Sequence, residues 1–397
     1  MSIDDFDQIA IQDTCITPEM EQEVAKEDYK YYYVDKRYSR PETMEYYTPP
    51  EELLMIGAGK KNPERMIYPL DGPYTEQEET TYEQLLEYFE DKDTEIPECM
   101  TKRRALRFLN GNAFNVKKTY KNIVQHLEWR EEMKPFILTQ GDMQLLDKGF
   151  LYIHGRDKNF RPFLITNAII IAEKGINPDD VFHTSWFMCH FLIENILKRG
   201  SVENWVEILD LGGLPISKIP VKALKKFMIE SQIHMKSRIA KMFLLYVTWG
   251  IRTIYAIISP FLEKRTKEKI VMKKGGFTPN QENFVFNEEI LEIAHPSQIE
   301  EKYGGEAENL TEHWPPISIS DEYGTDPECI TKSSSSTTPN THKRPSRVHQ
   351  EAVGTSSPPS QPKHFITDPI LPTEDNEPDI RPAPVAGKGK NCTCTIF

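Results

Sequence analysis

The sequence predicts an α/β fold in which a largely parallel sheet is flanked by helices and preceded by a small helical lobe. From about residue 149 onward, short apolar runs alternate with amphipathic segments of about ten or more residues. Strands joined by helices of that length form parallel sheets, because a parallel pair needs a long crossover connection. Between residues 75 and 135, only the helical period is present. We therefore expect a helical lobe before an α/β domain.

Residues 1–74 are predicted to form an acidic, tyrosine-rich, irregular arm. The first 100 residues hold 26 acidic and 9 basic side chains, so the remaining residues carry a net charge of +4 within a total of −13. The arm contains 9 of the 17 tyrosines, and repeated prolines interrupt regular elements in it. Two interpretations stay open: the tyrosines pack on the domain that follows, or the arm is disordered throughout.

Residues 75–135 are predicted to form the helical lobe. Thr75 and Glu78 have the spacing of a capping box, in which two residues satisfy each other's backbone N–H groups at a helix start. Three segments with apolar residues at helical spacing follow, and the last runs from Asn115 to Pro135. Each segment has one apolar side, so we expect the helices to pack together or onto the next domain.

Residues 136–316 are predicted to form the α/β domain. The apolar run Ile239–Leu262 has the length of a membrane span, but Lys241 and Arg252 divide it into stretches of about half the ~20 residues that a bilayer core requires. We interpret it as a buried strand followed by an apolar helix. The expected strands are Phe150–His154, Pro162–Thr166, Trp205–Leu211, Lys241–Val247 and Ile270–Met272, and the expected helices are Asp179–Leu197, a segment opened by Ile219 and Pro220, Ile251–Phe261 and a last piece from Glu288.

Residues 317–397 are predicted to be a disordered linker with a C-terminal lipidation motif. The segment is rich in Ser, Thr and Pro and lacks apolar periodicity. Its last four residues, Cys394–Phe397, fit the C-a-a-X rule, in which a final Phe favours geranylgeranylation. One lipid chain anchors a protein only weakly, so a second signal is expected, and palmitoylation of Cys392 is the best candidate. This predicts a cytoplasmic protein held peripherally at a membrane.

Several classes of protein are not indicated. The first residues lack the basic and apolar regions of a secretion signal, and widely spaced cysteines indicate a reducing compartment. No basic stripe interleaved with aromatic residues points to nucleic acid. His183, Cys189 and His190 follow an apolar helix pattern, where we expect a packed core and no metal. No nucleophile and base are grouped, so we expect no enzyme activity and no cofactor.

Five segments in the α/β region and the lobe before it share one order with a known family. They are Leu106–Leu109 with Phe114–Val116, Gly155–Asp157 with Arg161–Pro162, Ile208–Leu214, Pro260–Leu262 with Thr266–Lys269, and Pro296 with Lys302–Gly305. On these segments the chain resembles the CRAL-TRIO family, which includes a phosphatidylinositol transfer protein and retinaldehyde- and tocopherol-binding proteins. The resemblance spans roughly residues 75–310 and implies a hydrophobic pocket between the sheet and an apolar gate helix.

The resemblance also implies which side chains close the pocket. Removing one methylene group from water stabilises binding by about 0.8 kcal/mol, so a lipid stays bound until the gate opens. Contact with a membrane would favour opening, because it offers the apolar face of the gate another apolar environment. The alternative is an amphipathic helix that only covers the sheet. The expected pocket and gate residues are Tyr255, Ile257, Ile258, Phe261 and Leu262.

The resemblance gives a partial headgroup site. In phosphatidylinositol-binding members, the Thr and Lys of a TxxK turn hold the inositol phosphate, and Thr266 and Lys269 match that pattern. A hydroxyl group and a fixed cation at one phosphate are what this chemistry requires. The other basic partners of those members are replaced here by residues 110–113. Arg238 and Lys241 are candidates to compensate.

A further departure concerns the phosphatidylcholine-binding members of the family. They carry small hydroxyl residues at two positions where this chain has Trp205 and Glu207. The replacements at residues 110–113 leave half of the phosphoinositide site absent, and the residues at positions 205 and 207 make phosphatidylcholine the less favoured ligand.

The leading hypothesis is a membrane-tethered lipid-binding or lipid-transfer protein that holds one lipid in a gated hydrophobic pocket. Its partners would be a phospholipid or another hydrophobic ligand and a membrane surface. One alternative is a prenylated interaction scaffold with a degenerate pocket, which recruits proteins through the N-terminal arm and the Pro-rich linker. The other is a carrier of a small isoprenoid- or sterol-like molecule, which the missing headgroup ligands suggest.

Overall fold

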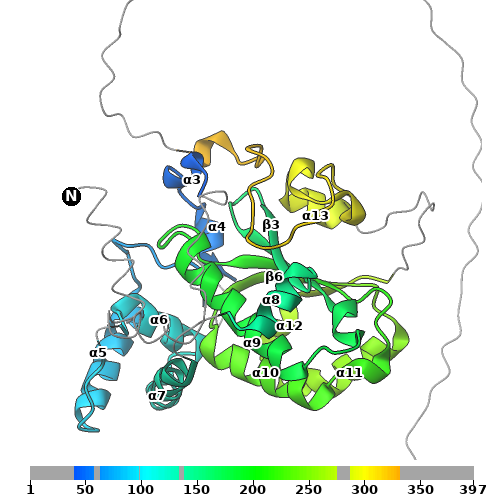
Figure 1. Cartoon of the computed structure of the whole chain (residues 1–397). Coiled ribbons are helices and arrows are strands. Elements are labelled where there is room, and N and C mark those ends of the chain that lie inside the picture. Colours follow the sequence, from blue (N-terminus) through cyan, green and yellow to red (C-terminus); the bar gives the residue numbers. More distant parts are fainter. Residues whose placement is uncertain (1–39, 58–62, 98, 134–137, 275–286, 331–397) are drawn as a thin grey trace, which may run out of the picture. The chain divides into compact units, whose positions relative to one another are not determined.

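The computed structural model describes residues 40–57, 63–97, 99–133, 138–274 and 287–330. At its centre lies a five-stranded sheet of order β3-β4-β5-β6-β7 (Figure 1). β3 and β4 pair antiparallel, and each later strand pairs parallel with its neighbour. The predicted α/β class with a largely parallel sheet is therefore confirmed. The strands are β3 (Leu151–Arg156), β4 (Pro162–Asn167), β5 (Trp205–Asp210), β6 (Ile239–Leu245) and β7 (Ile270–Met272).

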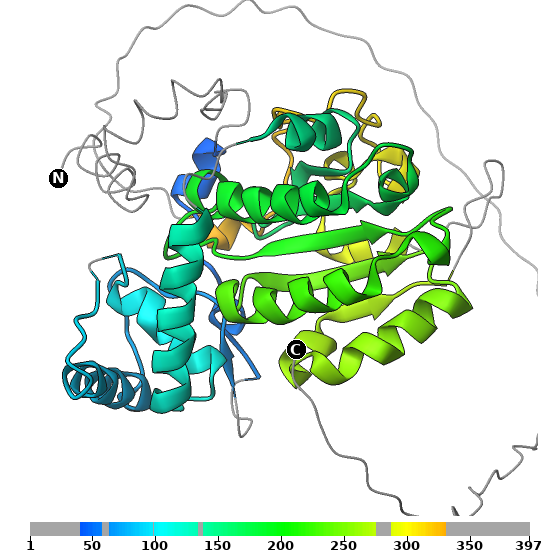
Figure 2. The ribbon, with the colours of Figure 1, turned by 60° about the horizontal axis from the view of Figure 1, so that its bottom comes forward.

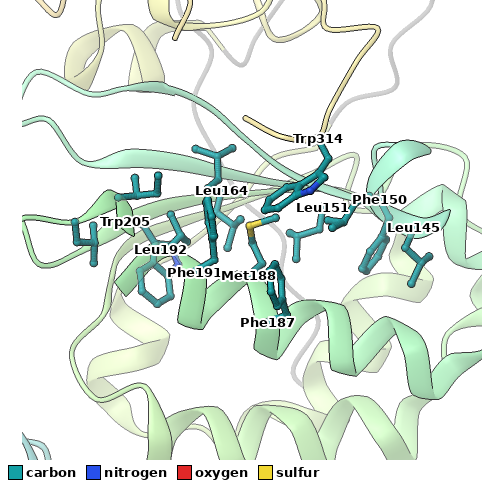
Figure 3. Packing of buried hydrophobic residues seen from close by; sticks show 14 of the residues in the cluster. Leu145, Phe150, Leu151, Leu164, Phe187, Met188, Phe191, Leu192, Trp205 and Trp314 are labelled. Atoms are coloured by element: carbon teal, nitrogen blue, oxygen red, sulfur yellow. The ribbon is translucent and has the colours of Figure 1, made fainter. Parts of the chain in front are cut away.

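Helices cover one face of this sheet (Figure 2). Leu164 and Trp205 of the sheet pack there with Met188 and Phe191 of α9 in one apolar cluster (Figure 3). Trp205 and Met188 are almost completely buried, so this cluster holds α9 firmly on the strands. The helices of the domain are α8 (Gln140–Asp147), α9 (Pro178–Phe191), α10 (Val221–His234), α11 (Trp249–Ile258), α12 (Lys264–Glu268) and α13 (Asn287–Ile293), and the short helical turns are Ala168–Ala172, Leu192–Ile196, Ile216–Lys218, Ser259–Phe261, Pro296–Gln298, Glu301–Tyr303 and Pro327–Cys329.

The opposite face of the sheet is covered by α13 and the chain that follows it. Phe163, Val206 and Phe243 project to this side and pack with Ile290 of α13 and with Tyr303. Successive side chains of a strand point to opposite faces, so Val206 lies on this side while Trp205 and Glu207 lie on the other. Both faces are covered, as expected for parallel strands that are apolar along their whole length.

Three helices pack around a separate apolar cluster before the sheet. They are α5 (Glu76–Glu90), α6 (Lys102–Gly111) and α7 (Val116–Met133), and the predicted helical region before the sheet is confirmed. At the start of α5, the backbone N–H of Glu78 donates to Thr75 Oγ1 at 3.2 Å, and the N–H of Thr75 donates to Glu78 Oε2 at 2.8 Å. The capping box inferred from the sequence is therefore present.

The described part of the acidic arm contains short elements and buried tyrosines. Tyr68 is completely buried in the cluster formed by α5, α6 and α7, and Tyr47 forms an isolated bridge with Ile330. Both tyrosines are buried, so the described part of the arm packs against the rest of the chain near each of them. Its elements are α3 (Glu42–Glu45), α4 (Glu51–Leu54), β1 (Met55–Ile56) and β2 (Glu64–Arg65), and β1 pairs antiparallel with β2.

The structure also bears on the expected apolar strand and helix over Ile239–Leu262 and on the expected C-terminal linker. The apolar run Ile239–Leu262 forms β6, α11 and a short turn, and none of the helices in the described ranges has the length and apolar character needed to cross a bilayer. The segment 317–330, expected to belong to the linker, instead packs on the domain, because Tyr323 is buried in the main apolar cluster. The rest of the expected linker lies outside the described residues.

Candidate functional site

A cavity of about 140 Å³ lies between the sheet and the helices α9 and α10. Its walls are mainly apolar, and its polar residues gather toward the turn before β7. This combination of an apolar interior with convergent polar groups is typical of a small-molecule site. The sheet contributes Leu151, Leu164, Thr166, Trp205, Glu207, Ile239, Met242 and Ile270, the helices contribute Ser185, Cys189, Phe227, Met228, Ser231, Gln232 and Met235, and the polar end consists of Glu64, Gly111, Lys236, Ser237, Arg238, Glu263, Arg265, Thr266 and Lys269.

One face of α10 forms much of the wall opposite the sheet. Phe227, Ser231 and Met235 recur at every fourth residue, so they lie along one side of the helix and all line the cavity. Only His234 of α10 is fully buried, because the side of the helix that faces the sheet is separated from it by the cavity. The sequence pattern did not indicate this wall, since the face mixes apolar and hydroxyl side chains.

The structure brings together three of the four predicted headgroup residues. Thr266, Lys269 and Arg238 line the polar end of the cavity. Lys241 does not line it, because it precedes Met242 on β6 and therefore points to the opposite face. Its Nζ lies 4.9 Å from the ring centre of Phe243.

An internal carboxylate pairs with the predicted headgroup lysine. Lys269 Nζ donates to Glu64 Oε1 at 2.9 Å, and the hydroxyl of Ser237 donates to the same oxygen at 2.8 Å. Burial lowers the pKa of Lys269, and Glu64 opposes this effect. Glu64 belongs to β2 in the acidic arm, so a phosphate at this position would have to compete with a carboxylate of the protein itself.

The neighbouring cations bind the helical lobe and the arm. Arg265 donates to the backbone oxygens of Asn110 at 2.9 Å and of Pro63 at 3.0 Å. Lys236 Nζ lies 3.4 Å from Glu263 Oε1, and its chain passes so close to Gly111 that a Cβ there would lie 2.5 Å from Lys236 Cδ. Residues 110 and 111 therefore provide a backbone oxygen and space for these cations.

A second carboxyl group lies on the floor of the cavity. Glu207 is in the middle of β5, in register with Leu164 of β4 and Met242 of β6, and its side chain lines the cavity. Burial raises the pKa of Glu207 to about 7. Burial also raises the pKa of the Cys189 thiol on α9, and the nearby charge of Glu207 adds to this effect.

The five predicted gate residues lie on α11 and the turn after it. Ile258 and Leu262 are buried, whereas Ile257 and Phe261 are 53% and 45% exposed. Tyr255 is half-buried. None of the five lines the cavity described above, so the structure does not bring them together with the headgroup residues.

The exposed face of α11 is apolar at both ends. Trp249 in its first turn is 82% exposed, and Phe261 beyond its last turn has Lys225 Nζ 3.4 Å from its ring centre. Gly250 allows α11 to approach Ile216, since a Cβ at this position would lie 1.8 Å from Ile216 Cδ1. The predicted lipidation residues Cys392 and Cys394 lie outside the described residues.

Comparison with known proteins agrees with this architecture. Residues 146–305 match the family model of the CRAL/TRIO domain. The chain contains a CRAL/TRIO domain. Proteins of this family bind lipophilic ligands. The match begins just before β3 and ends after Tyr303, so it includes the whole five-stranded sheet and all the residues that line the cavity except Glu64 and Gly111.

Two curated relatives come from Arabidopsis thaliana. Patellin-6 is 28% identical over 213 residues, which cover 50% of each chain. Patellin-3 is 24% identical over 229 residues, which cover 54% of this chain and 45% of the relative. The chain thus spans about half the length of the curated relatives it matches. A solved structure described as "Crystal structure of Sfh5" aligns with a TM-score of 0.41 and 13% identity, covering 51% of this chain and 81% of that one.

Proposed function

We propose that this chain binds one lipid molecule in the cavity of its CRAL/TRIO domain and transfers it between membranes or presents it there. The observation that carries this proposal is the apolar cavity between the sheet, α9 and α10, with polar residues at one end. A volume of about 140 Å³ would hold roughly ten water molecules, at about 10–15 Å³ each. A two-chain phospholipid is several times larger, so its entry requires the covering helices to move outward.

The proposed gate is the segment from α11 to α12. Trp249, Ile257 and Phe261 present exposed apolar surface along it, and exposed Lys264 and Lys267 follow. Large apolar side chains exposed together mark interaction surfaces, and basic residues attract anionic headgroups by about 1 kcal/mol each. A membrane would therefore bind this segment and favour displacement of its α12 end, whose Arg265 and Thr266 line the cavity.

Two ligand classes remain as proposals for this cavity. Thr266 and Lys269 at its polar end support a phosphatidylinositol headgroup, provided that Glu64 gives up its bond to Lys269. A small isoprenoid- or sterol-like ligand is supported by the size of the cavity and by that same internal ion pair, which already neutralises the lysine.

Native mass spectrometry of the purified full chain, followed by lipid extraction, tests the proposal. One phospholipid per chain would support the first ligand class, and one small hydrophobic molecule would support the second. An empty protein that cannot take labelled lipid from vesicles would contradict lipid carriage and favour an interaction scaffold.

The membrane tether is a separate proposal. It rests on the motif Cys394–Phe397 and the adjacent Cys392 alone. Geranylgeranylation of Cys394 would add a mass that intact-protein mass spectrometry detects, and palmitate on Cys392 would be released by hydroxylamine.

A further inference from the structure

We propose that the ligand of the cavity is an apolar molecule with one hydrogen-bond donor, a hydroxyl or an amine, which binds the carboxyl group of Glu207. This inference rests on the proposed function, because it names the ligand class of the same cavity. It assigns to Glu207 the role of a specificity-determining residue.

Apolar side chains surround this carboxyl group on the floor of the cavity. Leu164 and Met242 flank Glu207 on the neighbouring strands, and Trp205 lies two residues away on the same face. Within the described ranges, the backbone of Glu207 pairs in the sheet, but its side chain makes no hydrogen bond or ion pair. A carboxyl group without a partner in apolar surroundings costs several kcal/mol, and such groups in native proteins usually have a reason. A ligand in the adjacent cavity would supply the missing donor.

The polar side chains on the facing helices already have partners. The hydroxyl of Ser185 donates to the backbone oxygen of Val181 at 2.8 Å, and that of Ser231 donates to Phe227 O at 2.7 Å. Both hydroxyl groups therefore bond within their own helices. The charge of Glu207 raises the pKa of the Cys189 thiol on α9, and a thiol is only a weak donor.

The charge distribution disfavours an anionic ligand. Lys269 is paired with Glu64, and Lys236 with Glu263, so these two cations at the polar end have internal carboxylate partners. The carboxyl group of Glu207 would repel a phosphate that entered the apolar part of the cavity, and it would attract a hydroxyl or ammonium group.

The protonation of Glu207 suits such a donor. Burial raises its pKa to about 7, so both forms are present at neutral pH. The protonated form can donate to and accept from one hydroxyl group, whereas the ionised form would pair with an ammonium group. The two donor types thus use the same residue in different charge states.

Three probes that share one chain test the inference on the full-length protein: hexadecan-1-ol, its methyl ether and hexadecylamine. We expect the alcohol or the amine to bind about tenfold more tightly than the ether, which has no donor. Whichever of the two binds better identifies the donor type. Native mass spectrometry or displacement of a fluorescent fatty-acid probe gives the affinities.

Variants of Glu207 separate the donor site from general apolar binding. Glu207→Leu should bind all three probes alike, and Glu207→Gln should keep a preference for the alcohol but lose any preference for the amine. Glu83→Gln, which changes an exposed carboxylate on α5 outside the cavity, serves as the control and should keep the wild-type order. Thermal unfolding verifies that each variant is folded.

Two failures can be told apart. Equal binding of the ether and both donors by the wild type would overturn the inference and leave lipid binding intact. Binding of none of the probes, and of no phospholipid from phosphatidylcholine or phosphatidylinositol vesicles, would overturn the proposed function and the inference with it.

Discussion

The carboxyl group of Glu207 should make the stability of the CRAL/TRIO domain depend on pH. Its pKa is raised from 4.5 to about 7 by burial, so between these values the folded state keeps a proton that the unfolded state has lost. The free energy of unfolding therefore falls as the pH rises through this window. Since one pKa unit corresponds to about 1.4 kcal/mol, the loss amounts to about 3 kcal/mol, and water in the cavity would reduce it.

Urea unfolding of delipidated protein at pH 5 and pH 8 measures this effect. Glu207→Gln replaces the carboxyl group by a neutral group of the same shape, so its stability should resemble that of the wild type at pH 5. At pH 8 the variant should be more stable by about 1–3 kcal/mol, because the wild type then carries a buried charge. All other titrating groups are shared, so they cancel in the difference between the two proteins.

A surface variant provides the control for this measurement. Glu83→Gln removes an exposed carboxylate from α5 and should follow the wild type at both pH values within about 0.5 kcal/mol. Parallel pH profiles of the wild type and Glu207→Gln would refute the reasoning, since they would show that solvent reaches the carboxyl group in the folded state.

Three further results are expected. Glu203→Ala should lower the free energy of unfolding by about 3–5 kcal/mol in urea titrations, because buried Glu203 pairs with Arg107; a loss below 1 kcal/mol would contradict this. Glu64→Gln should raise binding to vesicles containing phosphatidylinositol several-fold by releasing Lys269, and an unchanged affinity would argue against a headgroup role for that lysine. Cys394→Ser should move the full chain from the membrane fraction to the soluble fraction, and unchanged fractionation would count against the tether.

The sheet could be predicted from the sequence because its strands are buried on both faces. Continuous apolar runs gave β5 and β6 to within two residues, and β7 with the same bounds. Helix α8 was not foreseen, since only Leu145 and Leu146 of its apolar residues are fully buried and eight residues show little periodicity. The segment 317–330 was assigned to the linker for a related reason: one buried ring, Tyr323, among polar residues produces no periodic signal.

The site was predictable only where it depends on local sequence. Thr266 and Lys269 lie in one short turn, and that turn brings both to the cavity. The partner of Lys269 is Glu64, which lies 205 residues earlier in an arm expected to be irregular. No pattern in the sequence encodes such a contact, because it depends on where the arm packs. The role of α10 as the cavity wall was hidden for a similar reason, since a face that borders a cavity need not be uniformly apolar.

The departures from the family pattern share one electrostatic direction. The resemblance implies basic residues at positions 110–113, where this chain has none, and Glu64 adds a carboxylate at the polar end of the cavity. Glu207 adds a second carboxyl group on the floor, at a position where the family resemblance implies a neutral hydroxyl in phosphatidylcholine-binding members. Each change alone would weaken binding of a phosphate. Together they favour a neutral or cationic ligand, because each described cation that lines this cavity already bonds an oxygen of the protein.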